Sequence, residues 1–212
     1  MKMKGFTMAE VLITLGLLGV VIAMTLPILF GKAEKMILAQ QFKKSYANIQ
    51  NAINAVQADY GATYECYNIG FGEYHIDECT AFWNAVISKM NIIQKCEKDN
   101  YDCHPRYKSK VEVLAEGGEV INNSCSMDFP FATYYILYDG SSLIVNSENF
   151  LSYHIIHFGI DVNGKKGPNK WGYDLFYLTL NRVDLKKDVV ATHKICAMKE
   201  KGGDYLLDMF LK

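Results

Sequence analysis

The feature that most constrains this chain is an apolar run near its start, from Val11 to Phe30. Between Phe6 and Phe30 the only ionisable side chain is that of Glu10. As an α-helix, residues 6–30 would be about 37 Å long, enough to cross a hydrocarbon core of about 30 Å with some tilt. The sequence therefore predicts a helix that spans a membrane.

Neither a secretory signal nor a plain anchor explains this run. A signal peptide has a shorter apolar stretch, of about 7 to 15 residues, and a small-x-small cleavage site. Here the run is longer, and its far part reads Met24-Thr25-Leu26-Pro27, which is not such a site. A carboxylate such as that of Glu10 costs about 2.5 to 3.5 kcal/mol in lipid on insertion scales. Glu10 therefore either lies in the headgroup layer at the positive end of the helix dipole or pairs with a cation.

A short basic leader ends in Gly5, and Phe6, Glu10 and an apolar run containing Pro27 follow it. This pattern resembles the prepilin signal of type IV pilins and of the pseudopilins of type II secretion. The resemblance implies that a prepilin peptidase cuts between Gly5 and Phe6 on the cytoplasmic side and methylates the new amine of Phe6. It also implies that the Glu10 carboxylate pairs with the amino terminus of a neighbouring subunit during filament assembly.

The helical pattern continues after the apolar run. Apolar residues at spacings of four and three form a narrow stripe, typical of a helix packed on one side: Phe42, Tyr46, Ile49, Ile53, Val56 and Tyr60. One helix from Phe6 to Tyr60 would be about 80 Å long. Within it, Pro27 removes a hydrogen bond, so we expect a kink or local loosening near Gly19 to Ala23. A coiled-coil seam is the weaker alternative, because the stripe is short.

From Phe131 the periodicity changes from helical to strand-like. Four strands with short links are expected: residues 131–138, 143–146, 153–162 and 174–180. Such a series indicates an antiparallel sheet that covers the apolar stripe. The expected fold class is therefore α+β, a long N-terminal helix packed against an antiparallel sheet and stapled by disulfides, which resembles the pilin fold.

The chain is expected to divide into a leader, a membrane-spanning assembly helix, its amphipathic continuation, an irregular disulfide-rich connection, and a sheet with the C-terminal segment: residues 1–5, 6–30, 31–60, 61–130 and 131–212. Residues 31–212 together would form one exported globular domain. Within the connection we expect a helix at 81–90 and a strand at 110–115. The apolar cluster at 205–211 is expected to pack against the sheet.

All six cysteines lie beyond the apolar run, as suits disulfides in an oxidising compartment: Cys66, Cys79, Cys96, Cys103, Cys125 and Cys196. Sequence alone does not choose among the pairings. Our working assignment joins Cys66 with Cys79, Cys96 with Cys103, and Cys125 with Cys196. A zinc site is the weaker alternative, because no Cys-x-x-Cys pair exists.

The lysines and the cysteines give conflicting orientations. Lys2 and Lys4 precede the apolar run, but more lysines follow it closely, so a count of positive charges would place the domain in the cytoplasm. The cysteines and the leader favour the opposite orientation. We therefore expect a single-pass protein of the inner (cytoplasmic) membrane, with its domain in the periplasm or outside the cell.

The loop from Asp161 to Asp174 begins like a calcium loop, with Asp-x-Asn, but Lys165 stands where an EF-hand has a ligand and no Glu closes it. Major pseudopilins of type II secretion carry a calcium ion in a loop of the β-region. The oxygen donors that could do likewise here are Asp161, Asn163, Asn169 and Asp174. The alternative is a glycine-bearing turn whose carboxylates cap backbone amides.

No pattern in the sequence indicates catalysis. There is no Ser, His and Asp arrangement at a familiar spacing, no HExxH motif and no phosphate loop. Isolated histidines such as His104 are expected at the surface or hydrogen-bonded. The formal charge of −1 gives no indication of nucleic-acid binding. We therefore expect neither an enzyme nor a nucleic-acid-binding protein, and calcium is the only cofactor considered.

The expected function is that of a structural subunit of a type IV pilus-like or type II secretion pseudopilus filament, polymerised through the N-terminal helix. The implied partners are other pilin or pseudopilin subunits, the prepilin peptidase, an inner-membrane assembly platform and membrane lipid. The alternative is a membrane-tethered extracytoplasmic binding domain that does not polymerise. The sequence leaves open a major or minor subunit, and a secretion, pilus or competence system.

Overall fold

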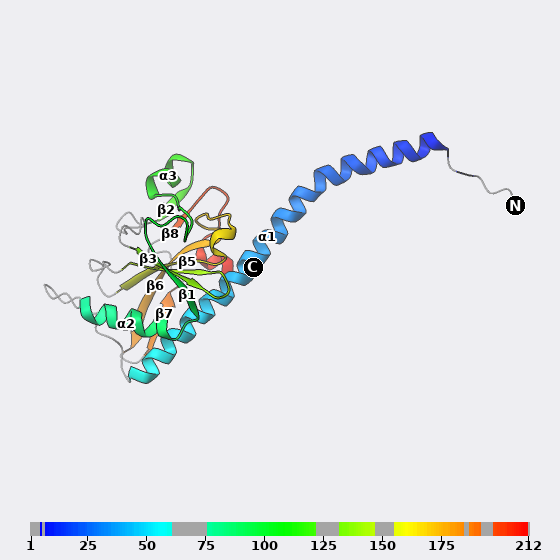
Figure 1. Ribbon diagram of the computed structural model, residues 1–212. Helices are drawn as coiled ribbons and strands as arrows, with labels where there is room; N and C mark the ends of the chain where they lie inside the picture. The colour runs from blue at the N-terminus through cyan, green and yellow to red at the C-terminus, as the bar shows by residue number, and fades with distance from the viewer. Residues whose placement is uncertain are drawn as a thin grey trace. The chain divides into compact units, whose positions relative to one another are not determined.

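The computed structural model describes residues 5, 7–60, 76–121, 132–146, 155–184, 187–191 and 197–211. The chain forms two compact units, Met1–Ile37 and Leu38–Lys212. Helix α1 (Met8–Tyr60) contributes to both units. The elements that follow it are α2 (Ile76–Ser88), β1 (Ile92–Glu97), α3 (Lys110–Ala115), β2 (Glu119–Ile121), β3 (Ala132–Leu137), β4 (Ser142–Asn146), β5 (Ile155–Asp161), η2 (Gly164–Lys166), β6 (Leu175–Asp184), β7 (Lys187–Ala191), β8 (Ala197–Lys199) and α4 (Leu206–Phe210) (Figure 1).

The first unit is the apolar half of α1. Its large hydrophobic side chains between Val11 and Phe30 are 41 to 69% exposed. The helix runs on without a break through Pro27, so the missing backbone donor does not end it. Within the described part of the chain, α1 is the one helix long and apolar enough to cross a membrane, as judged by length and composition.

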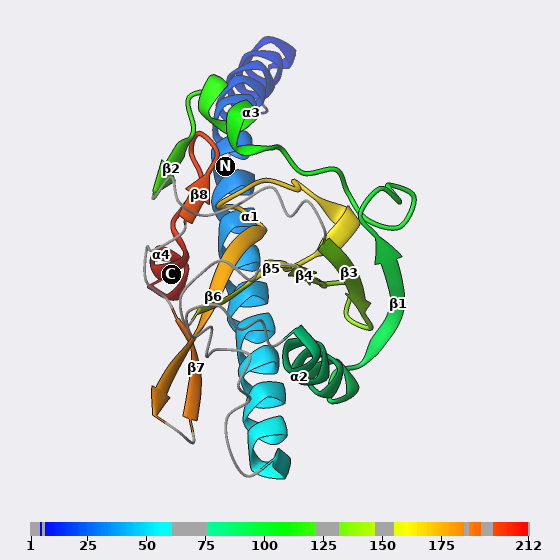
Figure 2. The ribbon, with the colours of Figure 1, turned by 90° about the vertical axis from the view of Figure 1, so that its left-hand side faces the viewer.

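The second unit is built around a six-stranded antiparallel sheet in the order β1-β3-β4-β5-β6-β7 (Figure 2). A separate two-stranded sheet pairs β2 with β8. The register places Leu143 opposite Ile160 and Phe158 opposite Leu178, so apolar residues of neighbouring strands share one face. The four expected strands are confirmed as β3 to β6, and the edge strands β1 and β7 were not expected.

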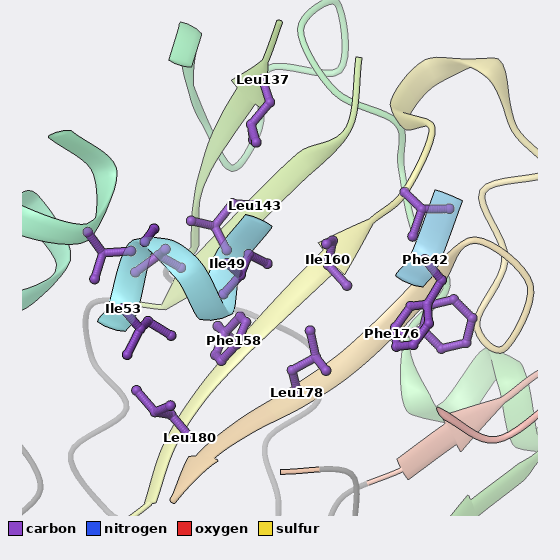
Figure 3. Packing of buried hydrophobic residues seen from close by; sticks show 14 of the residues in the cluster. Phe42, Ile49, Ile53, Leu137, Leu143, Phe158, Ile160, Phe176, Leu178 and Leu180 are labelled. Atoms are coloured by element: carbon purple, nitrogen blue, oxygen red, sulfur yellow. The ribbon is translucent and has the colours of Figure 1, made fainter. Parts of the chain in front are cut away.

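The second half of α1 packs on that face of the sheet. Figure 3 shows Phe42, Ile49 and Ile53 of the helix turned toward β5 and β6, and each is at most 1% exposed. The Phe42 and Phe176 rings lie 4.7 Å apart. The predicted stripe is therefore confirmed in these positions. The fold is therefore α+β, with a long N-terminal helix and an antiparallel sheet, as expected.

Two further helices close the same core. From α2, Trp83 lies against Phe158 with a ring separation of 5.5 Å. From α4, Leu206 and Met209 are buried, and the Phe210 ring lies 5.2 Å from that of Phe42. The C-terminal cluster therefore packs in the core as expected, with α1 as well as the sheet as its neighbour.

The opposite face of the sheet is covered by residues from the span that was expected to be irregular. Its buried cluster joins strand residues to Cys96, Cys103 and Val113 and to Trp171 in the loop before β6. Cys96 and Cys103 form a disulfide with a Cα separation of 5.9 Å, which confirms that pairing. Cys66, Cys125 and Cys196 lie outside the described residues, as does the side chain of Cys79.

The expected strand at residues 110–115 is wrong, because this segment is the helix α3. Ser109 caps it, and the Ser109 backbone N–H donates to the Glu112 carboxylate at 2.8 Å, which completes a capping box. Arg106 donates to Glu112 at 2.6 Å, and these bonds lower the pKa of Glu112 to about 2. Val113 is fully buried. A short apolar pattern of this kind fits either a strand or a helix, and the Ser109–Glu112 cap selects the helix.

Candidate functional site

The start of α1 holds the first group of predicted site residues. The Thr7 backbone N–H and the Thr7 hydroxyl both donate to Glu10 Oε2, each at 2.8 Å. The Glu10 backbone N–H donates to Thr7 Oγ1 at 3.2 Å. This reciprocal pair is a capping box that satisfies donors at the helix N-terminus. The Thr-x-x-Glu spacing was visible in the sequence, but its capping role was not part of the prediction.

The other N-terminal site residues are placed less fully. Gly5 is exposed, and Phe6 lies outside the described residues. Pro27 is exposed within α1. Between Gly5 and Pro27 the exposed apolar surface is therefore interrupted by one ionisable group, the carboxylate of Glu10.

The second candidate is the loop that joins β5 to β6. It begins at Asp161, the last residue of β5, and ends at Asp174, next to the first residue of β6. Gly164 and Gly167 adopt positive φ angles of 55° and 73°, which side chains disfavour, and a Cβ on Gly164 would lie 2.4 Å from the Gly140 carbonyl oxygen. These glycines let the loop fold back so that both of its ends enter the domain interior.

Asp161 is fully buried and bonded on both carboxylate oxygens. Oδ1 accepts from the backbone N–H of Asn163 at 3.1 Å and of Gly164 at 2.6 Å. Oδ2 accepts from the Tyr107 hydroxyl at 2.7 Å. Burial and then the nearby negative charge of Asp174 raise the pKa of Asp161 to about 7. Burial and then the proximity of Asp161 likewise raise the pKa of Tyr107 well above its usual value.

Asp174 is the second fully buried carboxylate. Its Oδ2 accepts from the backbone N–H of Asn169, and its Oδ1 from that of Lys170, both at 2.7 Å. Burial is the main cause that raises the pKa of Asp174. Both carboxylates thus cap backbone amides, as the glycine-turn alternative predicts.

Capping leaves other oxygen atoms of the loop unused. The side-chain oxygens Asn163 Oδ1 and Asn169 Oδ1 are buried, and neither has a hydrogen-bond partner in the described structure. The amide nitrogen of Asn163 donates to the Gly167 carbonyl at 2.6 Å, which fixes that side chain. Ser142 Oγ is also buried without a partner, and Ser142 stands opposite Asp161 in the β4–β5 register.

These atoms fit a hard cation. Calcium takes six to eight oxygen ligands drawn from carboxylates, amide side chains and backbone carbonyls. Asp161, Asn163, Asn169 and Asp174 would hold the ion, since each carboxylate oxygen of Asp174 retains a lone pair beyond its backbone bond. A bound ion would supply positive charge between two buried acids and satisfy the two amide oxygens. All four predicted ligands therefore come from one loop, in which both carboxylates and both amide oxygens are buried.

Lys165 does not take a ligand position. It is exposed, and its ammonium group donates to the backbone carbonyl of Asp102. The lysine that distinguishes this loop from an EF-hand therefore lies on the outside of the loop. Across the described residues, no three or more His, Cys, Asp and Glu side chains gather so as to hold a metal ion. The loop offers two carboxylates, and amide oxygens would complete the ligand set.

His104 fits the hydrogen-bonded alternative of the prediction and not the surface one, because it is 1% exposed. Its ring stacks on Tyr134 at 3.6 Å, and its two nitrogens lie 2.8 Å from the Pro105 carbonyl and 3.1 Å from the Glu97 carbonyl. These contacts tie the turn after β1 to β3. His104 is therefore part of the packing of the second core.

Comparisons of the chain with protein-family models, with curated proteins and with solved structures find no match.

Proposed function

We propose that this protein is a type IV pilin-like subunit, in a type IV pilus-like or type II secretion pseudopilus filament, that polymerises through the first half of α1. The single observation that carries the proposal is the exposed apolar half of α1 with Glu10 as its one ionisable group. Exposed apolar surface of this extent marks contact with lipid or with other proteins. A helix that assembles into a filament contacts lipid before polymerisation and neighbouring helices after it.

The construction of α1 supports the proposal. The same helix that exposes residues 11–30 carries Phe42, Ile49 and Ile53 into the core of the second unit. A subunit built in this way has its assembly segment and its displayed domain on one continuous helix. The proposed leader, cut between Gly5 and Phe6 by a prepilin peptidase, would place a new cationic amine four residues before Glu10.

The loop of residues 161–174 adds a second component to the proposal. Calcium bound by its four ligands would join the ends of β5 and β6, two strands whose apolar residues belong to the same core as the second half of α1. Its role would be to stabilise the displayed domain.

Replacing Glu10 tests the assembly mechanism. Glu10→Ala removes the charge and the capping acceptor, whereas Glu10→Gln keeps an oxygen that can accept from Thr7 but has no charge. If a carboxylate–amine pair drives assembly, both variants are cleaved normally and neither enters filaments. Cleavage is measured by N-terminal sequencing and incorporation by immunoblotting of sheared filaments. Replacing Gly5 should instead leave the uncleaved precursor in the membrane.

Glu34→Ala is the matched control, because Glu34 is an exposed acid on the same helix beyond the apolar run. It should be cleaved and assembled like the unaltered protein. Normal filaments from both Glu10 variants would contradict the mechanism. The alternative, a tethered binding domain, predicts that cysteines introduced near Glu10 form no crosslinks between copies in isolated membranes.

A further inference from the structure

A groove lies on the second unit where three elements meet. Its walls come from one side of α1, from the connection between α2 and β1, and from the turn between β3 and β4. Its volume is about 470 Å³, within the range of about 300 to 1,000 Å³ typical of small-molecule sites. The groove is separate from the loop of residues 161–174 and shares no residue with it.

The floor of the groove is apolar and held in place. Ala52 and Leu137 belong to the buried core and are 5% and 8% exposed. The Tyr138 backbone N–H donates to the Asn91 carbonyl at 2.9 Å, which joins the two loops that form the walls. The site is therefore preformed, and a ligand would not have to order it.

The charged groups at the rim are already paired. Lys44 lies 3.0 Å from Asp139, whose other carboxylate oxygen accepts from the Ser141 backbone N–H and hydroxyl at 3.2 and 2.6 Å. Lys89 pairs with Asp59. An anionic ligand would have to compete with these carboxylates for both lysines. The electrostatics of the groove therefore favour a ligand without net charge.

The remaining rim groups are amides and one aromatic ring. Asn48, Asn51 and Asn91 are exposed and present amide donors and acceptors around the apolar floor. Tyr138 also lines the groove and is 81% exposed, so its ring is open to a ligand. Amides that bond hydroxyl groups, next to a ring that takes the C–H face of a pyranose, are the groups that recognise a sugar.

We propose that this groove binds a neutral oligosaccharide, with a sugar ring stacked on Tyr138 and its hydroxyls bonded to the asparagine amides. This inference goes beyond the proposed function, because polymerisation through α1 needs no ligand. It would give the displayed domain a means of contact with glycans outside the membrane.

The test is isothermal titration of the full chain in a detergent without a sugar headgroup. The probes are the neutral tetrasaccharides chitotetraose, cellotetraose and maltotetraose, and the charged probes are tetragalacturonate and inorganic phosphate. At least one neutral probe should bind with a dissociation constant of about 1 mM or tighter. Tyr138→Ala should weaken binding about tenfold or more, whereas Tyr138→Phe, which keeps the stacking face, should change it less than about threefold.

Tyr101→Ala is the control, since Tyr101 is 53% exposed and does not line the groove, and it should leave binding unchanged. The high exposure of Tyr138 makes its replacement compatible with folding, which a thermal melt would verify. Failure of every neutral probe to bind would overturn the proposal. So would equal binding by Tyr138→Ala, or tighter binding of a charged probe that Lys44→Ala abolishes.

Discussion

Asn163 and Asn169 carry the strongest residue-scale signal of function in the described structure. A buried polar atom without a hydrogen bond costs about 1 to 3 kcal/mol, so two such oxygens in one loop need an explanation. The carboxylates beside them are buried as well; burial raises the pKa of both, and the charge of Asp174 raises that of Asp161 further. A bound divalent cation would both coordinate the unpaired amide oxygens and neutralise the buried carboxylates.

We predict that calcium raises the melting temperature of the full chain, because an ion that binds the folded state alone stabilises it by mass action. At a concentration of about 100 times the dissociation constant the gain is about 2.7 kcal/mol. Differential scanning calorimetry with calcium and with a chelator measures the shift. Asp174→Asn should remove most of it.

Lys165→Ala serves as the control for this measurement, since Lys165 lies in the same loop but points to the Asp102 carbonyl. It should keep the full calcium response. A melting temperature that is the same with calcium and with chelator would contradict the site.

Site residues were predictable from the sequence where they lie close together along the chain. Asp161, Asn163, Asn169 and Asp174 were identified because one loop contains them. Tyr107, which donates to Asp161, was missed because it lies 54 positions away and only the fold brings it there. The hydroxyl of Ser142 was missed for the same reason, because strand register places it opposite Asp161.

At the scale of elements, α1 is one helix with two kinds of surface. Ile22 in its first half is 49% exposed, and Ile53 in its second half is fully buried. Hydrophobic side chains of similar size are therefore exposed in the first half of the helix and buried in the second. Only those in the second half contribute to the stability of the folded domain.

We predict that Ile53→Ala lowers the free energy of unfolding of the domain by about 2 to 5 kcal/mol, because it leaves a cavity between α1 and the sheet. Ile22→Ala is the matched control and should leave that free energy unchanged. Chemical denaturation of detergent-solubilised protein, followed by near-UV circular dichroism, measures both. Equal losses from the two variants would contradict the division of α1.

Element types were predictable where the periodicity is long. The stripe of α1 and the strands β3 to β6 follow from patterns that repeat over many residues. Residues 110–115 were misassigned because so short an apolar pattern fits a strand or a helix, and the Ser109–Glu112 cap decided. Strand β1 was missed because four of its six residues are exposed or carry polar side chains, as at a sheet edge.

At the scale of the whole molecule, the chain joins a unit with an exposed apolar surface to a unit with its own two cores. The described residues of the first unit form no core, since the large side chains between Val11 and Phe30 are all substantially exposed. The affinity of the protein for lipid should therefore depend on residues 1–30 alone.

We predict that the full chain partitions into the detergent phase of a Triton X-114 separation, whereas a chain of residues 31–212 stays in the aqueous phase. Both should unfold with the same melting temperature, because every removed residue that the structure describes is exposed. Recovery of the shortened chain in the detergent phase would contradict the prediction. A lower melting temperature would show that residues 1–30 stabilise the second unit.

The division into an apolar segment and an α+β unit was predictable because composition changes sharply at Gly31 and periodicity changes at Phe131. The covering of both faces of the sheet was not predictable, because it depends on where residues 96–121 return in space. Their alternation is too weak to assign them to a face. Packing of the whole chain supplies that information.

The strand order also bears on how the protein folds during synthesis. Strands β3 to β7 pair in chain order, so each hairpin can form as soon as its second strand is made. Helix α1 is made first, yet the strands that cover Phe42, Ile49 and Ile53 come far later in the chain. In that interval the apolar stripe is open to aggregation, so the yield of folded protein should depend on what shields it until β6 is complete.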